Sequence, residues 1–271
     1  MRIKRRHPTI LLPFAVACMM SAVNIAAFAQ PKESQTPLQR QIEVQKNRLT
    51  SADAEERRDA LMKLTLMRRP EASRAAAASL NDPEPSVRVA AAHALTSTPS
   101  GDAANALIPL LEDKLEFVRR EVAYALGEGG SRDAIAPLTN LLATDKEMSV
   151  RAAAAVALGQ IKDEDETAVM ALAKAIDERA PNKKAEEYEF VRRAAVESLG
   201  EIRSPAGVEV LVSVLTNEGN SLDTRRAAAM ALGKVGSNSA VPALQAALHS
   251  DDPYLAEAAR EALRRMHAPL K

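Results

Sequence analysis

Histidine, cysteine and acidic side chains are the residues of this chain from which a catalytic or metal site could be built. Three of its four histidines, His93, His249 and His267, are isolated, and none stands at a metal-ligand spacing from a carboxylate or thiol. The single cysteine, Cys18, lies near the N-terminus. Neither an H-E-x-x-H helix nor a G-x-S-x-G elbow occurs. The sequence therefore predicts no catalysis of its own, no metal site and no cofactor.

Arginine is the charged residue with the most regular spacing in the chain. A cation in the first turn of a helix opposes the helix dipole, so these arginines need another partner. Acidic residues in the neighbouring turns are the nearest candidates, because an arginine can bind a carboxylate with two parallel hydrogen bonds. We expect a structural ladder of ion pairs, with a row of anion-binding sites as the alternative. The expected ladder residues are Arg57, Arg88, Arg119, Arg151, Arg192 and Arg225.

These arginines belong to a repeated segment, seen most clearly as V-R-A-A-A-A-V-A-L-G from Val150 to Gly159. Seven copies at steps of 31, 31, 32, 41, 33 and 31 residues indicate stacked supersecondary units. The copies begin at Glu56, Val87, Val118, Val150, Val191, Thr224 and Leu255.

Each unit reads as an apolar helix with a proline near its start, a short acidic turn and then the Val-Arg helix. Proline is tolerated in a first helical turn, where its missing N–H would lack a partner. The prolines are Pro109, Pro137 and Pro242. Glycine recurs near the end of the second helix, where it permits either a positive φ at a C-cap or a close helix approach. These glycines are Gly127, Gly159, Gly200 and Gly233.

The repeated unit of about 31 residues combines V-R-x-A-A-x-A-L-G with an A-V-P-x-L helix and an acidic turn. This combination resembles HEAT-like repeats of the phycobilisome-lyase type. The resemblance implies an all-α fold, an α-solenoid of the HEAT/armadillo kind. Residues 38–268 would form a right-handed superhelix of about seven antiparallel helix pairs. It does not imply lyase activity, because function depends on a site and not on a fold. An iron hydroxylase among such proteins uses His-Glu pairs from several repeats, and this chain has no His-Glu pair.

Motif positions that vary from unit to unit are the best candidates for a binding site, because the stack does not dictate them. With the leading residue as position 0, positions 0, 4 and 8 should be buried, and positions 2 and 6 should line the concave side. Arginine, tyrosine and methionine are enriched in protein interfaces. We expect a groove for an acidic or mixed peptide segment, with a solvated face as the alternative. The candidates are Arg58, Met62, His93, Arg120, Tyr124, Val156, Arg193, Arg226 and Met230.

The step of 41 residues contains an insertion over 181–190, which we read as an enlarged turn. Insertions in repeat proteins often carry recognition. Lys183, Lys184 and Tyr188 are therefore a second set of candidate partner-binding residues. Alternatively, the two lysines and the adjacent Glu186 and Glu187 form a solvated charge pair that extends a helix.

Residues 1–29 read as a signal peptide, because a basic cluster precedes an apolar run that ends in A-F-A before Gln30. We expect cleavage after Ala29, a flexible leader over 30–37, and a periplasmic or secreted protein. A retained membrane anchor and lipidation of Cys18 are the alternatives. We expect membrane contact only in those two cases.

Composition limits the kinds of partner. Removing the four basic residues of the signal segment leaves 32 Lys and Arg against 36 Asp and Glu, a net charge of −4 that argues against nucleic-acid binding. We therefore expect an exported monomeric scaffold that binds a protein or peptide. The alternative is an accessory or regulatory protein of bilin-lyase or oxidoreductase-like HEAT-repeat enzymes.

Overall fold

The structure is a computed structural model that describes residues 35–96, 101–178 and 185–270. Over these ranges it contains fourteen α-helices, five short 3₁₀ segments and no strand. All the helices belong to one unit, Pro37–Lys271. The all-α prediction is confirmed. No helix in the described ranges has the length and apolar character needed to span a membrane.

The helices form seven successive pairs, as the resemblance implied. The pairs are α1 (Pro37–Arg48) with α2 (Ala54–Met67), α3 (Pro70–Ala76) with α4 (Pro85–Thr96), α5 (Gly101–Leu107) with α6 (Glu116–Gly129), α7 (Ile135–Thr144) with α8 (Met148–Ile161), α9 (Glu166–Asp177) with α10 (Ala185–Ile202), α11 (Val208–Thr216) with α12 (Leu222–Val235), and α13 (Val241–Ala247) with α14 (Pro253–Arg265).

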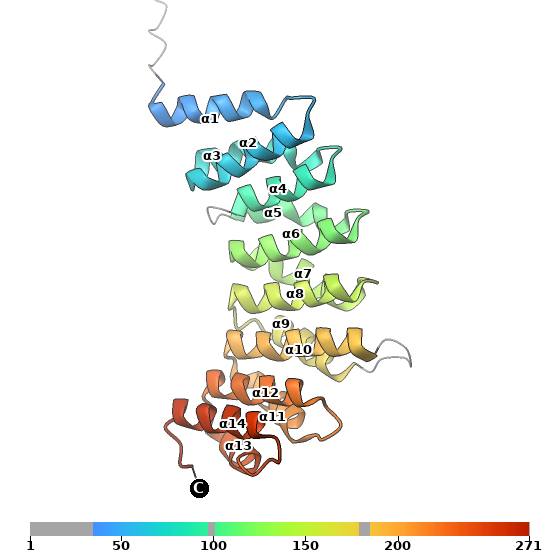
Figure 1. The fold of residues 1–271 in the computed structure, drawn as a ribbon, viewed down its shortest axis with the longest axis vertical. Coiled ribbons are helices and arrows are strands. Elements are labelled where there is room, and N and C mark those ends of the chain that lie inside the picture. Colours follow the sequence, from blue (N-terminus) through green and yellow to red (C-terminus); the bar gives the residue numbers. More distant parts are fainter. Residues whose placement is uncertain (1–34, 97–100, 179–184, 271) are drawn as a thin grey trace, which may run out of the picture. The chain divides into compact units, whose positions relative to one another are not determined.

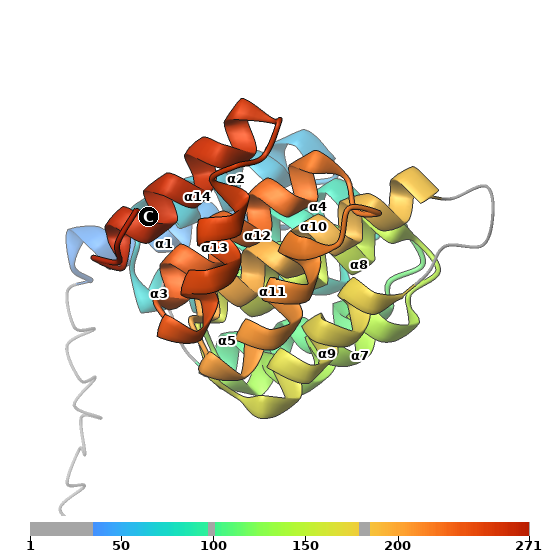
Figure 2. The ribbon, with the colours of Figure 1, turned by 90° about the horizontal axis from the view of Figure 1, so that it is seen from below.

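The paired helices of this unit lie in two layers (Figures 1 and 2). The second helices of the pairs, α2 to α14 in even numbers, lie side by side in one layer, and each packs against the next. The first helices follow one another in the other layer. We call the outer side of the even-numbered layer the second-helix face.

The core follows the predicted motif positions. In α8, positions 0, 4 and 8 are Val150, Ala154 and Leu158, and all three are fully buried. Alanine and leucine are strong helix formers, and alanine lets adjacent helices approach closely. Position 2 of the same helix, Ala152, was expected on the open face but is also buried. The side chain of Ala152 is short, so the neighbouring helices α6 and α10 can cover it.

Close helix approach, and not helix capping, explains the four glycines of the motif. A Cβ atom on Gly159 would lie 2.8 Å from Ser198 Cα on the next second helix. A Cβ atom added to any of the other three glycines would likewise lie 2.7 to 2.8 Å from a Cα atom of the next second helix. Positive-φ helix ends fall on other residues, such as Gly130 and Gly236. The glycines that meet a neighbouring Cα are Gly127, Gly159, Gly200 and Gly233, opposite Ala157, Ser198, Ala231 and Ala262.

Pro109 differs from the predicted helix start. The helix α5 ends at Leu107, and the chain continues as a 3₁₀ segment, Ile108–Glu112, that contains Pro109. A proline in the interior of an α-helix lacks the N–H and clashes with the preceding turn, so the helix changes form at this point. The prediction was correct for Pro137 and Pro242, which lie in the first turns of α7 and α13.

Candidate binding surface

The predicted arginine ladder is formed in its first part. Arg57 binds Asp82 with two hydrogen bonds of 2.7 Å, and Arg88 binds Asp113 at 2.8 and 3.1 Å. Arg119 binds Asp145 at 2.7 and 3.0 Å. In each case the arginine lies on the second helix of one pair, and the aspartate lies in the turn before the second helix of the next pair. The ladder therefore joins neighbouring units.

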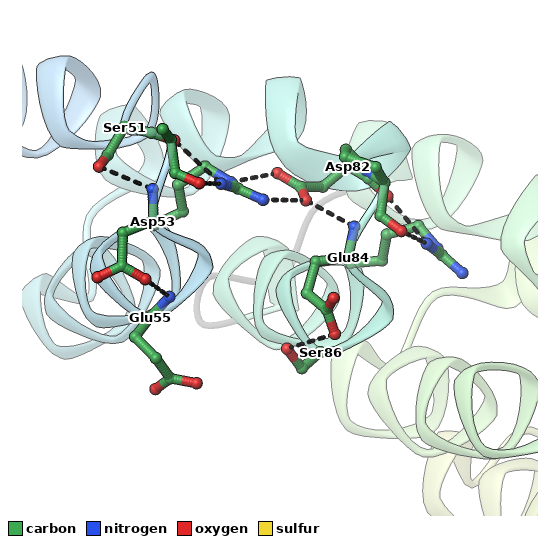
Figure 3. A network of polar contacts seen from close by, with 10 residues as sticks. Ser51, Asp53, Glu55, Asp82, Glu84 and Ser86 are labelled. Atoms are coloured by element: carbon green, nitrogen blue, oxygen red, sulfur yellow. Dashed lines mark hydrogen bonds and ion pairs between the residues drawn. The ribbon is translucent and has the colours of Figure 1, made fainter.

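Each arginine–aspartate pair of the ladder also holds the turns of the two units that it joins. Arg88 Nη1 donates to the carbonyl of Asp82 at 2.9 Å, so Asp82 accepts from arginines of two units. Asp82 Oδ1 accepts the N–H of Glu84 at 2.9 Å. Figure 3 shows Asp82 and Glu84 on one turn and Ser51 on the preceding turn, linked by this network. The ladder is therefore a continuous network of hydrogen bonds along successive turns.

The ladder carboxylates are held in the charged form. Partial burial raises the pKa of Asp145, but hydrogen bonds from Arg119 and from the N–H of Glu147 outweigh this effect, so its pKa lies below the ordinary value. The pKa values of Asp82 and Asp113 are lowered for the same reasons.

The lowered pKa of the ladder carboxylates predicts how the stability of the fold depends on pH. A carboxylate whose pKa is lower in the folded state stabilises the fold above its unfolded pKa, about 3.9, and loses that contribution as the pH falls through the folded pKa. We expect the difference in unfolding free energy between the wild type and Asp145→Ala to shrink as the pH falls from about 5 to about 2. Urea unfolding across this range measures it. A difference of constant size would show that ionised Asp145 does not stabilise the fold.

In the second part of the ladder Arg151 still pairs with an acid of the adjacent unit, as predicted, whereas Arg192 and Arg225 depart from the prediction. Arg151 binds Glu178 through both Nη atoms and donates from Nε to the carbonyl of Leu142 at 2.7 Å. Arg192 binds the carbonyls of Ile176 and Glu178, and pairs with Glu189 of its own helix.

Within the described ranges Arg225 lacks the expected carboxylate, and its Nε donates to the carbonyl of Leu215 at 2.9 Å. The turn before α14 contains an aspartate that could have paired with it, Asp252, but this residue pairs with Arg226. Arg226, expected only in the groove, also has Tyr254 beneath its guanidinium, 5.1 Å from the ring centroid. The expectation of a turn carboxylate was therefore wrong for Arg192 and Arg225, because their turns carry no acid at the required position.

The insertion is a helix over much of its length. The helix α10 begins at Ala185, so the prediction of an enlarged turn was wrong for 185–190. Lys183 and Lys184 lie outside the described residues. Tyr188 is half-buried in α10, and Arg151 lies over its ring at 5.7 Å from the centroid. In this structure Tyr188 packs on the ladder.

A groove of about 510 Å³ lies on the second-helix face, between α8, α10 and α12. Four of the nine predicted groove residues line it: Val156, Arg193, Arg226 and Met230. Three residues that were not predicted, Gln160, Glu201 and Lys234, also line the groove. These residues stand at motif position 10, one helical turn beyond position 6, so extending the row of positions 2 and 6 would have found them.

The charged groups of this groove are largely paired with one another. Lys234 binds Glu201 at 2.6 Å, and Lys162 lies 3.8 Å from the same carboxylate. The hydrogen bond from Lys234 is the main reason that the pKa of Glu201 is lowered. Arg193 lies 3.9 Å from Glu197. Paired charges therefore surround apolar Val156 and Met230, and the Met230 side chain is 55% exposed.

The other five predicted residues lie on α2, α4 and α6, outside this groove. Arg58 pairs with Glu55 of its own helix at 2.6 Å, and Met62 is 59% exposed. Arg120 pairs with Glu121 at 3.0 Å. His93 lies 3.8 Å from Glu121 and 3.9 Å from Glu128, and Tyr124 is half-buried against the core. The structure therefore does not bring all nine candidates into one site.

No group of three or more histidine, cysteine or acidic side chains in the described part of the chain is arranged to hold a metal ion.

The arrangement of helices and ladder defines the class of protein, an α-helical solenoid of repeated helix pairs. The chain matches the family model for HEAT repeats over residues 42–124, 106–188 and 183–264. It therefore belongs to the HEAT-repeat family.

Comparisons with individual proteins point to the phycobilisome-lyase type of HEAT-like repeat. The chain is 29% identical over 196 residues to the uncharacterized phycocyanin operon protein Z of Pseudanabaena tenuis, covering 69% of this chain and 91% of that protein. It is similar in fold to the complex of CpcE and CpcF of phycocyanin lyase from Nostoc, with a TM-score of 0.50 and 24% identity over 87% of this chain and 90% of the other. The YibA protein of Escherichia coli matches with a TM-score of 0.57 and 19% identity, over 85% and 82% of the two chains.

Proposed function

We propose that this protein is an exported, monomeric scaffold that binds a protein partner at the groove between α8, α10 and α12 and has no catalytic activity of its own. The observation that carries the proposal is the composition of the groove. An exposed methionine and a valine lie among paired charges on a face built by three consecutive units.

Two physical arguments support a protein ligand. Arginine and methionine are enriched in protein interfaces, and a methionine adapts its shape to a partner because its side chain is unbranched. The paired charges at the rim can exchange their mutual contacts for contacts with a partner, which favours recognition of a segment of mixed charge.

The test combines Arg193→Glu with Met230→Ala. We expect a partner captured from exported proteins by the chain from Gln30 onward to bind the double variant at least about tenfold more weakly, because central interface residues each contribute more than about 1 kcal/mol. Isothermal titration calorimetry measures the affinity.

The matched control makes the same two kinds of substitution on first helices, Arg74→Glu on α3 and Met170→Ala on α9. Both side chains are exposed. This control should bind as the wild type does. Equal affinity of the groove variant and the wild type would exclude the groove as the binding site.

A second candidate is an accessory or regulatory role beside bilin-lyase or oxidoreductase-like HEAT-repeat enzymes. The observation that favours it is the 29% identity to a phycocyanin operon protein. Incubating this chain with a bilin and an acceptor protein tests for lyase activity, and covalent attachment of the bilin would overturn the proposal of a scaffold without catalysis.

The export proposal rests on residues 1–29, which lie outside the described part of the structure. Their basic cluster, apolar run and A-F-A ending support cleavage after Ala29. The intact mass of the protein recovered from its host should then correspond to a chain that begins at Gln30. Retention of residues 1–29 would favour a membrane anchor, and a lipid on Cys18 would favour a lipoprotein.

A further inference from the structure

Arg225 is a ladder arginine without its carboxylate. Its Nε donates to the carbonyl of Leu215 at 2.9 Å, and the described residues supply no carboxylate to its Nη atoms. Arg151 holds its guanidinium in the same way, with Nε on the carbonyl of Leu142 at 2.7 Å. In that case both Nη atoms bind the carboxylate of Glu178. By this comparison, the Nη edge of Arg225 stands where a carboxylate could bind, and none of the described residues supplies one.

A single residue accounts for the missing carboxylate. Asp82, Asp113 and Asp145 each stand five residues before the leading residue of their motif, and Ser250 stands at that position in the last unit. Ser250 Oγ accepts the N–H of Asp252 at 3.2 Å, as Asp82 accepts the N–H of Glu84 at 2.9 Å. The turn is therefore preserved, and only the charged group is absent.

Nearby acids do not take over this role. The carboxylate of Asp252 accepts the N–H of Leu255 at 2.6 Å and pairs with Arg226. Glu218 and Asp251 are exposed at the rim, where they leave the site with negative charge beside the arginine.

A crevice of about 720 Å³ opens at this place, along the turns between α11, α12, α13 and α14. Arg225 and His249 line it together with the two rim acids, the polar residues Thr216, Ser250 and Asp252, and several apolar side chains. The apolar lining residues are Leu215, Leu222, Ala243, Ala246, Ala247 and Pro253. The crevice lies on the turn edge and shares no lining residue with the groove between α8, α10 and α12.

We propose that this crevice binds a peptide segment of a partner that carries an acidic side chain next to a basic one. The carboxylate of the segment binds the Nη edge of Arg225, where the other units use their own aspartate or glutamate. The basic side chain of the segment lies against Glu218 and Asp251. An arginine fork binds a carboxylate with two parallel hydrogen bonds, which gives the contact a defined geometry as well as a favourable charge.

The test measures the Nε–Hε signal of Arg225 by NMR in the purified full chain, during titration with the capped dipeptide acetyl-Asp-Lys-amide. We expect a saturable shift, and binding at least about tenfold weaker for acetyl-Asn-Lys-amide and for acetate, since one good charged contact accounts for about that factor. The absence of a saturable shift would overturn the proposal. So would equal binding of the Asn peptide, and equal binding of acetate would show an anion site without peptide recognition.

Ser250→Asp supplies the missing carboxylate from within the chain. It should abolish the shift and raise Tm by about 2–4 °C. The control Ser250→Asn keeps the turn without the charge, so it should bind the peptide as the wild type does. Arg225→Lys keeps the charge without the fork and should bind at least about tenfold more weakly. Undiminished binding by Ser250→Asp or by Arg225→Lys would contradict the proposal, whatever the variants at Arg193 and Met230 show.

Discussion

Asp145→Ala is expected to lower the free energy of unfolding by about 3–5 kcal/mol, because it leaves the guanidinium of Arg119 buried without its partner. The two side chains are only 9% and 6% exposed and share two hydrogen bonds. The substitution also removes the acceptor for the N–H of Glu147. Urea unfolding at neutral pH measures the loss.

An exposed ion pair provides the control for this prediction. Arg132 pairs with Asp163 at 2.7 Å, and the two side chains are 73% and 20% exposed, so loss of Asp163 leaves an arginine in contact with water. Exposed pairs contribute less than about 1 kcal/mol, so Asp163→Ala should cost no more than that. Equal losses for Asp145→Ala and Asp163→Ala would show that burial of the ladder does not determine its contribution.

Gly159→Ala is expected to lower the free energy of unfolding by about 1–3 kcal/mol, because the added methyl group overpacks the contact between α8 and α10. A Cβ atom at this position would lie 2.7 to 2.8 Å from three atoms of Ser198, including its Cα. Backbone atoms of a packed helix cannot move aside without separating the two units. Chemical denaturation measures the change.

The sign of this effect separates packing from helix propensity. Alanine is favoured over glycine inside a helix by about 1 kcal/mol, so propensity by itself predicts that Gly159→Ala stabilises the protein. Gly101→Ala is the control, since its Cβ would meet only Asp133 Oδ2, at an ordinary 3.4 Å. It should leave stability nearly unchanged. A stabilised Gly159→Ala variant would contradict the role of this glycine in close approach.

The repeat made most of the fold predictable from the sequence. Every unit buries the alanine or valine at position 4 and the leucine at position 8, and every unit after the first also buries its leading residue, because the second helix packs against its neighbours. The pairing of Arg57, Arg88 and Arg119 with turn acids followed from the need of each arginine for a partner. The repeat also identified the four motif glycines. It could not decide whether they end a helix or permit close approach of two helices, because that depends on where the neighbouring helix lies.

Individual turns were less predictable, because their partners come from residues distant in sequence. Arg151 binds Glu178, which stands just before the insertion, and Tyr188 packs on that arginine only because α10 begins earlier than its motif. In the last unit a serine, Ser250, stands where other units have an aspartate, and the aspartate stands two residues later as Asp252. The carboxylate therefore pairs with Arg226 and not with Arg225.

The candidate site was predicted in part for a similar reason. The helical row of positions 2 and 6 identified Val156, Arg193, Arg226 and Met230. It could not show that the groove is lined by only three units, since that depends on how the second helices are placed in space. Arg58, Met62, His93, Arg120 and Tyr124 follow the same pattern but lie on helices outside the groove.

The most direct test of the proposed binding face is photocrosslinking from two exposed methionines in the native host. A benzophenone side chain would replace Met230 on α12 or, as the control, Met170 on α9, whose exposed fractions are 55% and 63%. The account predicts a discrete crosslinked protein from position 230 and none from position 170. The same crosslinked protein from both positions, or one from position 170 only, would contradict a binding site on the second-helix face.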